Sequence, residues 1–280
     1  MPTTRHSSST EDNKARITIT LRQSLLPQLD RCIDGEQLRN RSHAIEYILS
    51  QYLGAGIEHV VVFCGGNGPD LPALTVIQQR PVIAYWLDMM KAIGVRSVIV
   101  VIDKYGDPLK EYLGTGQSWG VQITYVRDTR AVGTAHALSL VQPLLETRFV
   151  LLYSDMLMRI NLNDMAEHHQ QAQTVATMGL TYTRDTNPYG VARMEGTRIV
   201  EFSEKLGDTG QHGLVNAGVF LFEPTVFDYL DTSTRSLETQ VLPRLAKDKQ
   251  LTGYPFQSPW FDVSRQSGRQ LAQDQWDSSL

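Results

Sequence analysis

From His59 onward, apolar runs typical of strands alternate with segments of helical periodicity, and this alternation constrains the fold more than any other feature of the chain. The runs HVVVFC, SVIVVID and VQITYV are short and rich in β-branched residues, whereas VIAYWLDMMKAIG repeats its apolar side chains at helical spacing. Such alternation predicts a mostly parallel α/β sheet with helices on both faces. The chain has 280 residues, enough for one domain of this kind and a small module before it.

The stretch RITITL near the N-terminus alternates strictly between polar and apolar residues. Ile17, Ile19 and Leu21 fall on one face, which predicts a half-buried strand over residues 15–21. Two helices are expected to follow, the first capped by Ser24 and the second by Ser42. A lone strand in so small a module cannot satisfy its backbone groups. We therefore expect it to pair with the strand of a second copy, in a homodimer or a higher even oligomer.

Residues 14–53 resemble the ribbon-helix-helix family of DNA-binding proteins, through the RITITL strand and the NRSHAIEYIL start of the second helix. In that family a two-stranded antiparallel ribbon enters the major groove of DNA. The resemblance implies that the strand reads base edges through Arg16, Thr18 and Thr20. It also implies a phosphate contact at the start of the second helix, made by Arg41 and Ser42. The alternative is an ordinary edge strand in a module that only dimerises the protein.

Six stretches of the remaining chain occur in the order and approximate spacing of a second family. They are CGGNG, VGTAHAL, LLYSDMLMRINL, YGVARMEGTRIVEFSEKL, VNAGVFLFEP and PWFDV. Through them, the stretch from residue 58 to about residue 275 resembles the sugar-1-phosphate nucleotidyltransferases, in a domain expected over residues 58–280. The resemblance implies a Rossmann-like, mostly parallel sheet of the GT-A-like kind, with a site that binds a nucleotide, a sugar phosphate and Mg²⁺.

The residues of that site are implied position by position. Asp155, which ends the apolar run FVLLYSD, and Asp262 are implied as catalytic metal ligands. The implied nucleotide-binding residues are Gly65, Gly66, Gly68, Gly133 and Thr134. Those implied to bind the sugar and its phosphate are Tyr189, Gly190, Glu204, Lys205, Asn216 and Gly218. Structural alternatives are a turn cap for Asp155, a surface acid for Asp262, a plain helix cap for VGTAHAL and a solvated charge pair for FSEKL.

The glycine-rich loop departs from the family pattern at its charged positions. The family reads Gly-Gly-x-Gly-Thr-Arg-Leu, and here Pro69 and Asp70 stand where the threonine and the phosphate-binding arginine are expected. Losing one preorganised donor to transition-state charge typically costs about 10² to 10³ in rate, and a carboxylate near a polyphosphate is worse than a neutral gap. Arg80 replaces the family lysine and keeps a catalytic cation. Arg265 is a further candidate for returning the missing charge.

Two functions follow from these patterns. In the first, the protein is a DNA-binding transcriptional regulator whose large domain binds a nucleotide, sugar nucleotide or sugar phosphate as a signal, with weakened catalysis. In the second, it is an active sugar-1-phosphate nucleotidyltransferase with an autoregulatory DNA-binding module. A purely structural dimer is a third. Residues 1–13 are expected to be a disordered arm without the apolar core of a secretory signal, and no apolar run is long enough to span a bilayer, so we expect a cytoplasmic protein.

Overall fold

A computed structural model of the chain describes residues 17–35, 38–53, 56–65, 68–204 and 212–277. The chain divides into two compact units, Met1–Leu49 and Ser50–Leu280, called here the small unit and the large unit. None of the helices in the described ranges is both long and apolar enough to cross a membrane.

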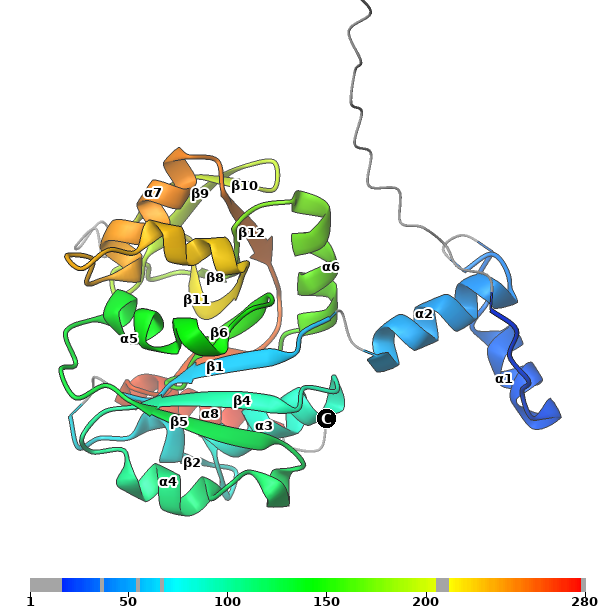
Figure 1. Cartoon of the computed structure of the whole chain (residues 1–280), viewed down its shortest axis with the longest axis horizontal. Coiled ribbons are helices and arrows are strands. Elements are labelled where there is room, and N and C mark those ends of the chain that lie inside the picture. The colour runs from blue at the N-terminus through cyan, green and yellow to red at the C-terminus, as the bar shows by residue number, and fades with distance from the viewer. Residues whose placement is uncertain (1–16, 36–37, 54–55, 66–67, 205–211, 278–280) are drawn as a thin grey trace, which may run out of the picture. The chain divides into compact units, whose positions relative to one another are not determined.

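The small unit is helical over much of its described length (Figure 1). Its helices are η1 (Gln23–Leu25), α1 (Leu26–Arg31) and α2 (Arg41–Leu53), of which α2 continues past the division between the units. Asn40 caps α2, because its side-chain oxygen accepts a hydrogen bond from the backbone N–H of His43 at 3.0 Å. The predicted caps are therefore wrong: Ser42 lies in the first turn of α2, and Ser24 lies inside η1.

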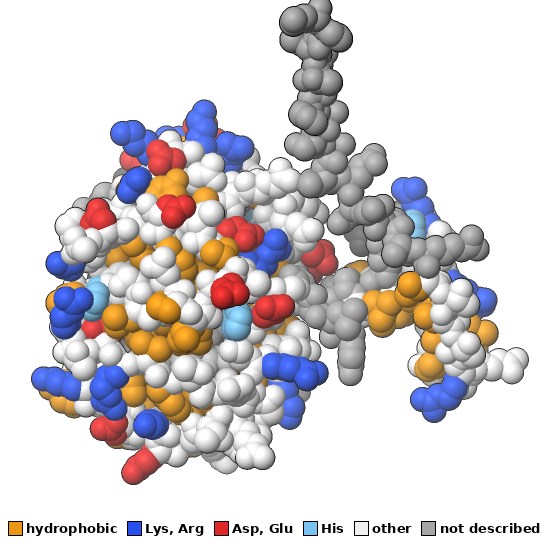
Figure 2. All heavy atoms as spheres, in the orientation of Figure 1, with side chains coloured by type: hydrophobic (Ala, Val, Ile, Leu, Met, Phe, Trp, Pro, Cys, Tyr) orange, Lys and Arg blue, Asp and Glu red, His pale blue; other side chains and the backbone are white. Residues whose placement is uncertain are grey.

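The strand predicted over residues 15–21 is not formed in the part of it that the structure describes, which begins at Ile17. A strand takes its hydrogen bonds from a neighbouring edge, and no described segment of the small unit offers one. Its apolar side chains stay exposed, 67% for Ile17 and 45% for Ile19. Figure 2 shows hydrophobic side chains at the surface of this unit. The exposed ones are Ile17, Ile19, Leu21, Leu25, Tyr47, Ile48 and Leu49.

The large unit alternates strands and helices along the chain. Its strands are β1 (His59–Phe63), β2 (Val76–Ile77), β3 (Arg80–Pro81), β4 (Ser97–Ile102), β5 (Gln122–Arg127), β6 (Phe149–Tyr153), β7 (Met156–Met158), β8 (Ala176–Thr183), β9 (Val191–Glu195), β10 (Arg198–Ser203), β11 (Gly213–Phe222), β12 (Leu251–Pro255) and β13 (Trp260–Asp262). Its helices are α3 (Val82–Ala92), α4 (Asp107–Leu113), α5 (Thr134–Val141), α6 (Leu162–Ala172), α7 (Leu242–Lys247) and α8 (Gln266–Gln275). Its short helical turns are η2 (Pro72–Leu74), η3 (Gln117–Trp119), η4 (Gln142–Leu144), η5 (Pro224–Tyr229) and η6 (Leu237–Val241).

One large sheet runs through this unit in the order β5-β4-β1-β6-β11-β8-β12-β10-β9. The first four of these strands are parallel, and β5, β4 and β1 lie side by side in the lower half of the unit (Figure 1). From β11 onward the sheet is mixed, because β11 runs antiparallel to both β6 and β8. The tight turn at Gly196 also makes β9 and β10 an antiparallel hairpin. The prediction of a mostly parallel sheet is thus wrong for this half, and the fold is mixed α/β.

Helices cover both faces of the sheet, as predicted, and each face carries its own hydrophobic core. In β1, Val60 and Val62 enter one core while Val61 enters the other, as the alternation of side chains along a strand requires. Residues of α3, α6 and α8 belong to the first core, and residues of α5 and α7 to the second. The central parallel strands are therefore held from both sides, and the edge where they end is a rigid platform.

Candidate functional site

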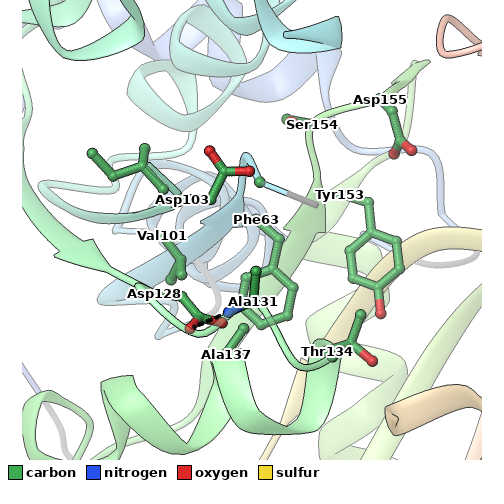
Figure 3. Close-up of a pocket in the computed structure, with 13 residues that line it drawn as sticks. Phe63, Val101, Asp103, Asp128, Ala131, Thr134, Ala137, Tyr153, Ser154 and Asp155 are labelled. Atoms are coloured by element: carbon green, nitrogen blue, oxygen red, sulfur yellow. Dashed lines mark hydrogen bonds between the residues drawn. The ribbon is translucent and has the colours of Figure 1, made fainter. Parts of the chain in front are cut away.

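A cavity of about 360 Å³ opens where the parallel strands end (Figure 3). The strand order reverses at β1, which has β4 on one side and β6 on the other, and α/β proteins bind ligands beside such a reversal. Phe63 at the end of β1 and Tyr153 at the end of β6 stack with their ring centroids 5.8 Å apart and form part of the wall. Four predicted site residues line this cavity, namely Gly65, Gly133, Thr134 and Asp155.

The glycine-rich loop follows β1 and passes very close to the end of β4. A Cβ atom added to Gly65 would lie 3.1 Å from both the Cβ and the backbone nitrogen of Asp103, so a larger residue would require Asp103 to shift by a few tenths of an ångström. Gly68 has a φ of +66°, which also favours glycine. Gly66 lies outside the described residues. The loop thus supplies a tight backbone turn at the edge of the cavity.

The charged residues around the loop form ion pairs. Arg80 pairs with Asp88 at 2.6 Å and lies over the ring of Tyr85, 5.0 Å from its centroid. It is not among the residues that line the cavity of about 360 Å³, so its catalytic role stays a prediction. Asp70, the residue in place of the expected arginine, pairs with Arg269 of α8 at 2.7 Å.

The N-terminus of α5 forms a second wall of the cavity. Gly133 has a φ of +134°, and a Cβ atom there would overlap the carbonyl oxygen of Arg235. The hydroxyl of Thr134 donates to one carboxylate oxygen of Glu238 at 2.7 Å, and the hydroxyl of Tyr153 donates to the other. Burial and the adjacent Glu238 carboxylate hold the pKa of Tyr153 well above its usual value. Figure 3 shows the Tyr153 ring directed toward Thr134, so one carboxylate fixes both side chains.

The two predicted metal ligands are brought together by strand pairing. β7 and β13 form an antiparallel ribbon in which Asp262 lies opposite Met156, the residue after Asp155. The backbone N–H of Val263 donates to the carbonyl oxygen of Asp155 at 2.8 Å. Asp155, in the turn that precedes β7, therefore lies next to the end of β13 that carries Asp262, although the two residues are far apart in the chain.

The Asp262 carboxylate is buried and surrounded by donors. It accepts hydrogen bonds from the backbone N–H of Ser264 at 3.0 Å and from the hydroxyl of Tyr189 at 3.3 Å. The guanidinium of Arg265 lies 3.6 Å from it. Burial first, and the neighbouring Asp262 second, raise the pKa of Tyr189. These partners compensate the buried charge and fix the orientation of the carboxylate.

Four of the predicted sugar-binding residues lie close to one another. The backbone N–H of Asn216 donates to the carbonyl of Gly190 at 2.9 Å, and its side chain accepts from the N–H of Gly218 at 2.9 Å. A Cβ atom on Gly218 would lie 2.7 Å from Met156, and one on Gly190 would lie 2.6 Å from the Glu204 carboxylate. Lys205 lies outside the described residues. Glycine at both positions lets the backbone approach its neighbours closely.

A second cavity, of about 390 Å³, is lined by Tyr189 and Asp262. Trp260, which also lines it, packs edge-on against Tyr189 with ring centroids 5.0 Å apart and donates to the carbonyl of Ala217 at 2.9 Å. Asp155 lies at the first cavity and Asp262 at the second, and the β7–β13 ribbon joins them. The arrangement suits two ligands whose reacting groups meet at two carboxylates.

Asp155 and Asp262 are suitable ligands for Mg²⁺. Mg²⁺ is usually bound through one or two carboxylates together with substrate phosphates and waters, and carboxylate oxygens are the hard ligands it prefers. In the described ranges, no group of three or more His, Cys, Asp or Glu residues is placed to hold a metal ion. We therefore expect a metal here only together with a phosphate ligand.

Two further acids at the first cavity were not predicted. Asp103 and Asp128 line it, and each is only 6% exposed. Asp103 directly follows the apolar strand β4 and Asp128 directly follows β5, which is the same pattern that singled out Asp155. Glu238 had no such signal, because it lies in η6, far along the chain from the two residues it fixes.

The predicted DNA-binding residues lie in the small unit. Thr18, Thr20 and Ser42 are exposed, and Arg16 lies outside the described residues. Arg41 pairs with Asp30 of α1 at 2.7 Å, and this hydrogen bond lowers the pKa of the Asp30 carboxyl. DNA binding through these residues stays a prediction.

Comparison with known proteins gives the family of the large unit. The profile described as "Nucleotidyl transferase" matches residues 69–268, a stretch that contains Asp155 and Asp262. The chain belongs to this family. All of the small unit's described residues precede the match.

The relatives include mannose-1-phosphate guanyltransferase of Yarrowia lipolytica, 28% identical over 220 residues, which cover 73% of this chain and 60% of the relative. Mannose-1-phosphate guanylyltransferase catalytic subunit beta of Dictyostelium discoideum is 27% identical over 218 residues, with the same coverage. The chain thus spans about 60% of the length of these curated relatives.

Solved structures share the fold of the large unit. HddC from Yersinia pseudotuberculosis superposes with a TM-score of 0.69 at 15% identity, covering 79% of this chain and all of that one. A UDP-glucose pyrophosphorylase in complex with UDP-glucose gives 0.68 at 19% identity, covering 78% of this chain and 97% of that one. At these identities the likeness establishes the fold alone.

Proposed function

We propose that the large unit is an active nucleotidyltransferase that joins a nucleoside triphosphate to a sugar 1-phosphate. The observation that carries this proposal is the pairing of β7 with β13, which brings Asp155, in the turn before β7 and at the first cavity, next to Asp262, at the second. One cavity is suited to the nucleotide and the other to the sugar phosphate. Membership of the nucleotidyl transferase family supports the same assignment.

In this reaction, an oxygen of the sugar phosphate attacks the α-phosphorus of the nucleoside triphosphate. The bond from that phosphorus to the oxygen that bridges to the β-phosphate breaks, and pyrophosphate leaves. Bound Mg²⁺ would neutralise charge on the phosphate oxygens. Gly65, Gly66, Gly68 and the start of α5 would hold the nucleotide through backbone N–H groups. With both substrates bound next to each other, the rate would rise mainly through proximity and orientation.

The sugar phosphate would bind in the second cavity and beside β7. Gly190, Asn216 and Gly218 would admit the sugar close to the backbone, and Tyr189 would position it through its contact with Asp262. Glu204, together with Lys205, is proposed to contact the sugar and its phosphate. A lysine near the phosphate would offset its charge.

The base we propose is guanine. Guanine presents two adjacent donors on its Watson–Crick edge, whereas uracil and thymine present one donor between two acceptors. Ionised carboxylates are acceptors only, and Asp103 and Asp128 both line the first cavity. The curated relatives described above are also named as guanylyltransferases acting on mannose 1-phosphate. GTP with mannose 1-phosphate is therefore the first substrate pair to test.

Of the two hypotheses drawn from the sequence, the active enzyme is better supported than the sensor with weakened catalysis. The sensor was favoured because Asp70 replaces an arginine beside the nucleotide. In the structure, Arg269 pairs with the Asp70 carboxylate, so a cation does lie beside the glycine-rich loop. The two acids proposed to bind the metal, Asp155 and Asp262, are also both present and lie next to each other.

A pyrophosphate-release assay with Mg²⁺, the four common nucleoside triphosphates and a panel of hexose 1-phosphates tests this proposal. We expect release only when both substrates are present, fastest with GTP. Release that does not depend on a sugar phosphate would contradict transfer, because it would indicate simple hydrolysis. Absence of release with every pair would reject the enzyme hypothesis and favour the hypothesis of a ligand sensor with weakened catalysis.

A second function is proposed for the small unit: it pairs with that of a second copy and binds DNA. The observation that favours it is the exposure of the apolar side chains of Ile17, Ile19 and Leu21, which alternate with polar residues along the chain. Pairing two such strands would bury these side chains and present Arg16, Thr18 and Thr20 on the other face. Arg41 would have to leave Asp30 to reach a phosphate.

Fluorescence anisotropy with DNA from upstream of the protein's own operon tests this second function. We expect binding that weakens steeply with salt, because phosphate contacts release counterions. Arg16→Ala is expected to weaken binding to that DNA more than to an unrelated duplex. Binding that is independent of salt, or equal for both duplexes, would argue against sequence-selective recognition.

A further inference from the structure

Asp70 stands where a nucleotidyltransferase of this pattern is expected to carry a phosphate-binding arginine, and in the structure an arginine comes to it from elsewhere. The guanidinium of Arg269, in α8, donates to the Asp70 carboxylate at 2.7 Å. The two residues are 199 positions apart in the chain. The sequence of the glycine-rich loop lacks this cation, but the folded chain places one, from α8, beside the loop.

Arg269 is also tied to the strand that carries Asp262. Its Nε–H donates to the carbonyl oxygen of Val263 at 2.6 Å. A Cβ atom added to the preceding residue, Gly268, would overlap the carbonyl oxygen of Asp262 itself, so the start of α8 packs directly on that backbone. Val263 in turn donates to the carbonyl oxygen of Asp155 at 2.8 Å. The Arg269 guanidinium therefore bridges the glycine-rich loop and the pair of acids.

The other two arginines considered for this role face different ways. Arg80 pairs with Asp88 and lies over Tyr85. Arg265 pairs with Asp262 and lines the second cavity, which we assign to the sugar phosphate. Of these three arginines, Arg269 contacts the glycine-rich loop, through Asp70.

We propose that Arg269 is the cation that binds the β- and γ-phosphates and the departing pyrophosphate, and that Asp70 holds it in place before the nucleotide binds. This inference rests on the proposed nucleotidyltransferase function. Guanidinium has five N–H donors in a rigid fork, so Arg269 can keep its bond to Val263 while its other N–H groups turn from Asp70 to a phosphate. Arg269 would thus exchange its contact with Asp70 for a contact with a phosphate.

The exchange is energetically feasible because the pair is exposed. The side chains of Arg269 and Asp70 are 36% and 59% exposed, respectively. Exposed ion pairs contribute little to stability, whereas a polyphosphate offers several charged acceptors to one guanidinium. A polyphosphate is therefore expected to outcompete the Asp70 carboxylate. Without the nucleotide, the same carboxylate keeps the guanidinium from turning into solvent.

Isothermal titration of the full-length protein with inorganic pyrophosphate, GTP and GMP, each with Mg²⁺, tests this proposal. Arg269→Gln is expected to weaken pyrophosphate and GTP binding by about tenfold to a hundredfold, because hydrogen bonds to charged groups are lost. Binding of GMP, which lacks the β- and γ-phosphates, is expected to stay within about twofold. Arg193→Gln is the matched control: Arg193 is exposed and paired with Glu195 and Glu201, and we expect no change.

Asp70→Asn gives a second test that does not depend on how Arg269→Gln folds. Asn removes the competing charge but keeps an oxygen that accepts from the guanidinium, so pyrophosphate binding is expected to be equal or tighter, whereas weaker binding would overturn the proposal. Equal pyrophosphate affinity in Arg269→Gln and wild type would also overturn it. In that case, turnover measured with the wild-type protein would still support the enzyme assignment. If the wild-type protein binds neither GTP nor pyrophosphate, the proposed function itself is rejected along with the inference.

Discussion

The two units differ in how completely they bury their apolar residues. The large unit covers both faces of its sheet and encloses two hydrophobic cores. Among the described residues of the small unit, Leu29 and Ala44 are buried, while seven large apolar side chains are exposed. Exposed apolar patches of this kind mark a surface for a partner. The comparison teaches that the large unit buries its apolar surface within one chain, whereas the small unit is expected to do so only as a pair.

Among the substitutions that should affect one unit and not the other, Asp155→Asn is expected to have the largest effect, on turnover by the large unit. Loss of a carboxylate that holds Mg²⁺ removes several kcal/mol of transition-state stabilisation, so turnover should fall by about 10³-fold. Self-association, which we assign to the small unit, should not change. Pyrophosphate release and sedimentation velocity measure the two properties on the same sample. An active Asp155→Asn variant would contradict the assignment of the site.

Next in size is the effect of Gly133→Ala on the stability of the large unit. The added Cβ would overlap the Arg235 carbonyl and the residue would keep a strained φ, at a combined cost of about 3 kcal/mol. Gly196→Ala is the matched control, since Gly196 has a φ of +60° and nothing within 4 Å of the added Cβ. Urea unfolding should show a much smaller loss for Gly196→Ala. Equal losses would mean that the close approach to Arg235 contributes nothing.

The small unit is tested by Ile19→Lys. If Ile19 is buried in a pair of strands, placing a charge there should cost about 1.5 to 3 kcal/mol per copy and weaken self-association at least tenfold. Turnover per large unit should be unchanged. Thr18→Lys adds the same charge on the other face and is expected to leave self-association intact. A monomeric wild-type protein at micromolar concentration would refute the pairing of the small units.

The smallest effect is a pH dependence of stability in the large unit. His169 is buried, with its Nδ1 2.7 Å from the Thr177 hydroxyl, and burial lowers its pKa. As the pH falls below the unfolded value of about 6.5, the unfolded chain takes up a proton before the folded one, so stability is lost. The slope from this residue is at most about 1.4 kcal/mol per pH unit. Urea unfolding between pH 7.5 and 5 should show a shallower slope in His169→Gln than in wild type, and the same slope in His212→Gln, where the residue is exposed.

Much of the large unit could be predicted because its signals are local. Short β-branched runs such as Val60–Val62 identify the central strands, and acids that end such runs identify the edge that carries the site. The direction of β11 could not be predicted in this way. Strand direction depends on how the chain returns to the sheet, and the residues of β11 are apolar whichever way it runs.

Within the site, the acids could be predicted but not their partners. Asp155 and Asp262 were identified from motifs, and Asp103 would have followed from the same rule. The pairing of Asp70 with Arg269 joins positions 199 residues apart, and no local pattern links them. Sequence comparison with the family thus indicated a missing cation, while the three-dimensional arrangement supplies one from α8.

The central claim is that this chain transfers a nucleotidyl group to a sugar 1-phosphate, and ³¹P NMR of a reaction with GTP, mannose 1-phosphate and Mg²⁺ tests it most directly. We predict that the signals of a nucleotide sugar and of pyrophosphate rise in equal amounts, and that neither rises in Asp155→Asn. Unchanged substrate signals with this pair and with the other nucleoside triphosphates and hexose 1-phosphates, at enzyme concentrations near those of the substrates, would contradict the claim.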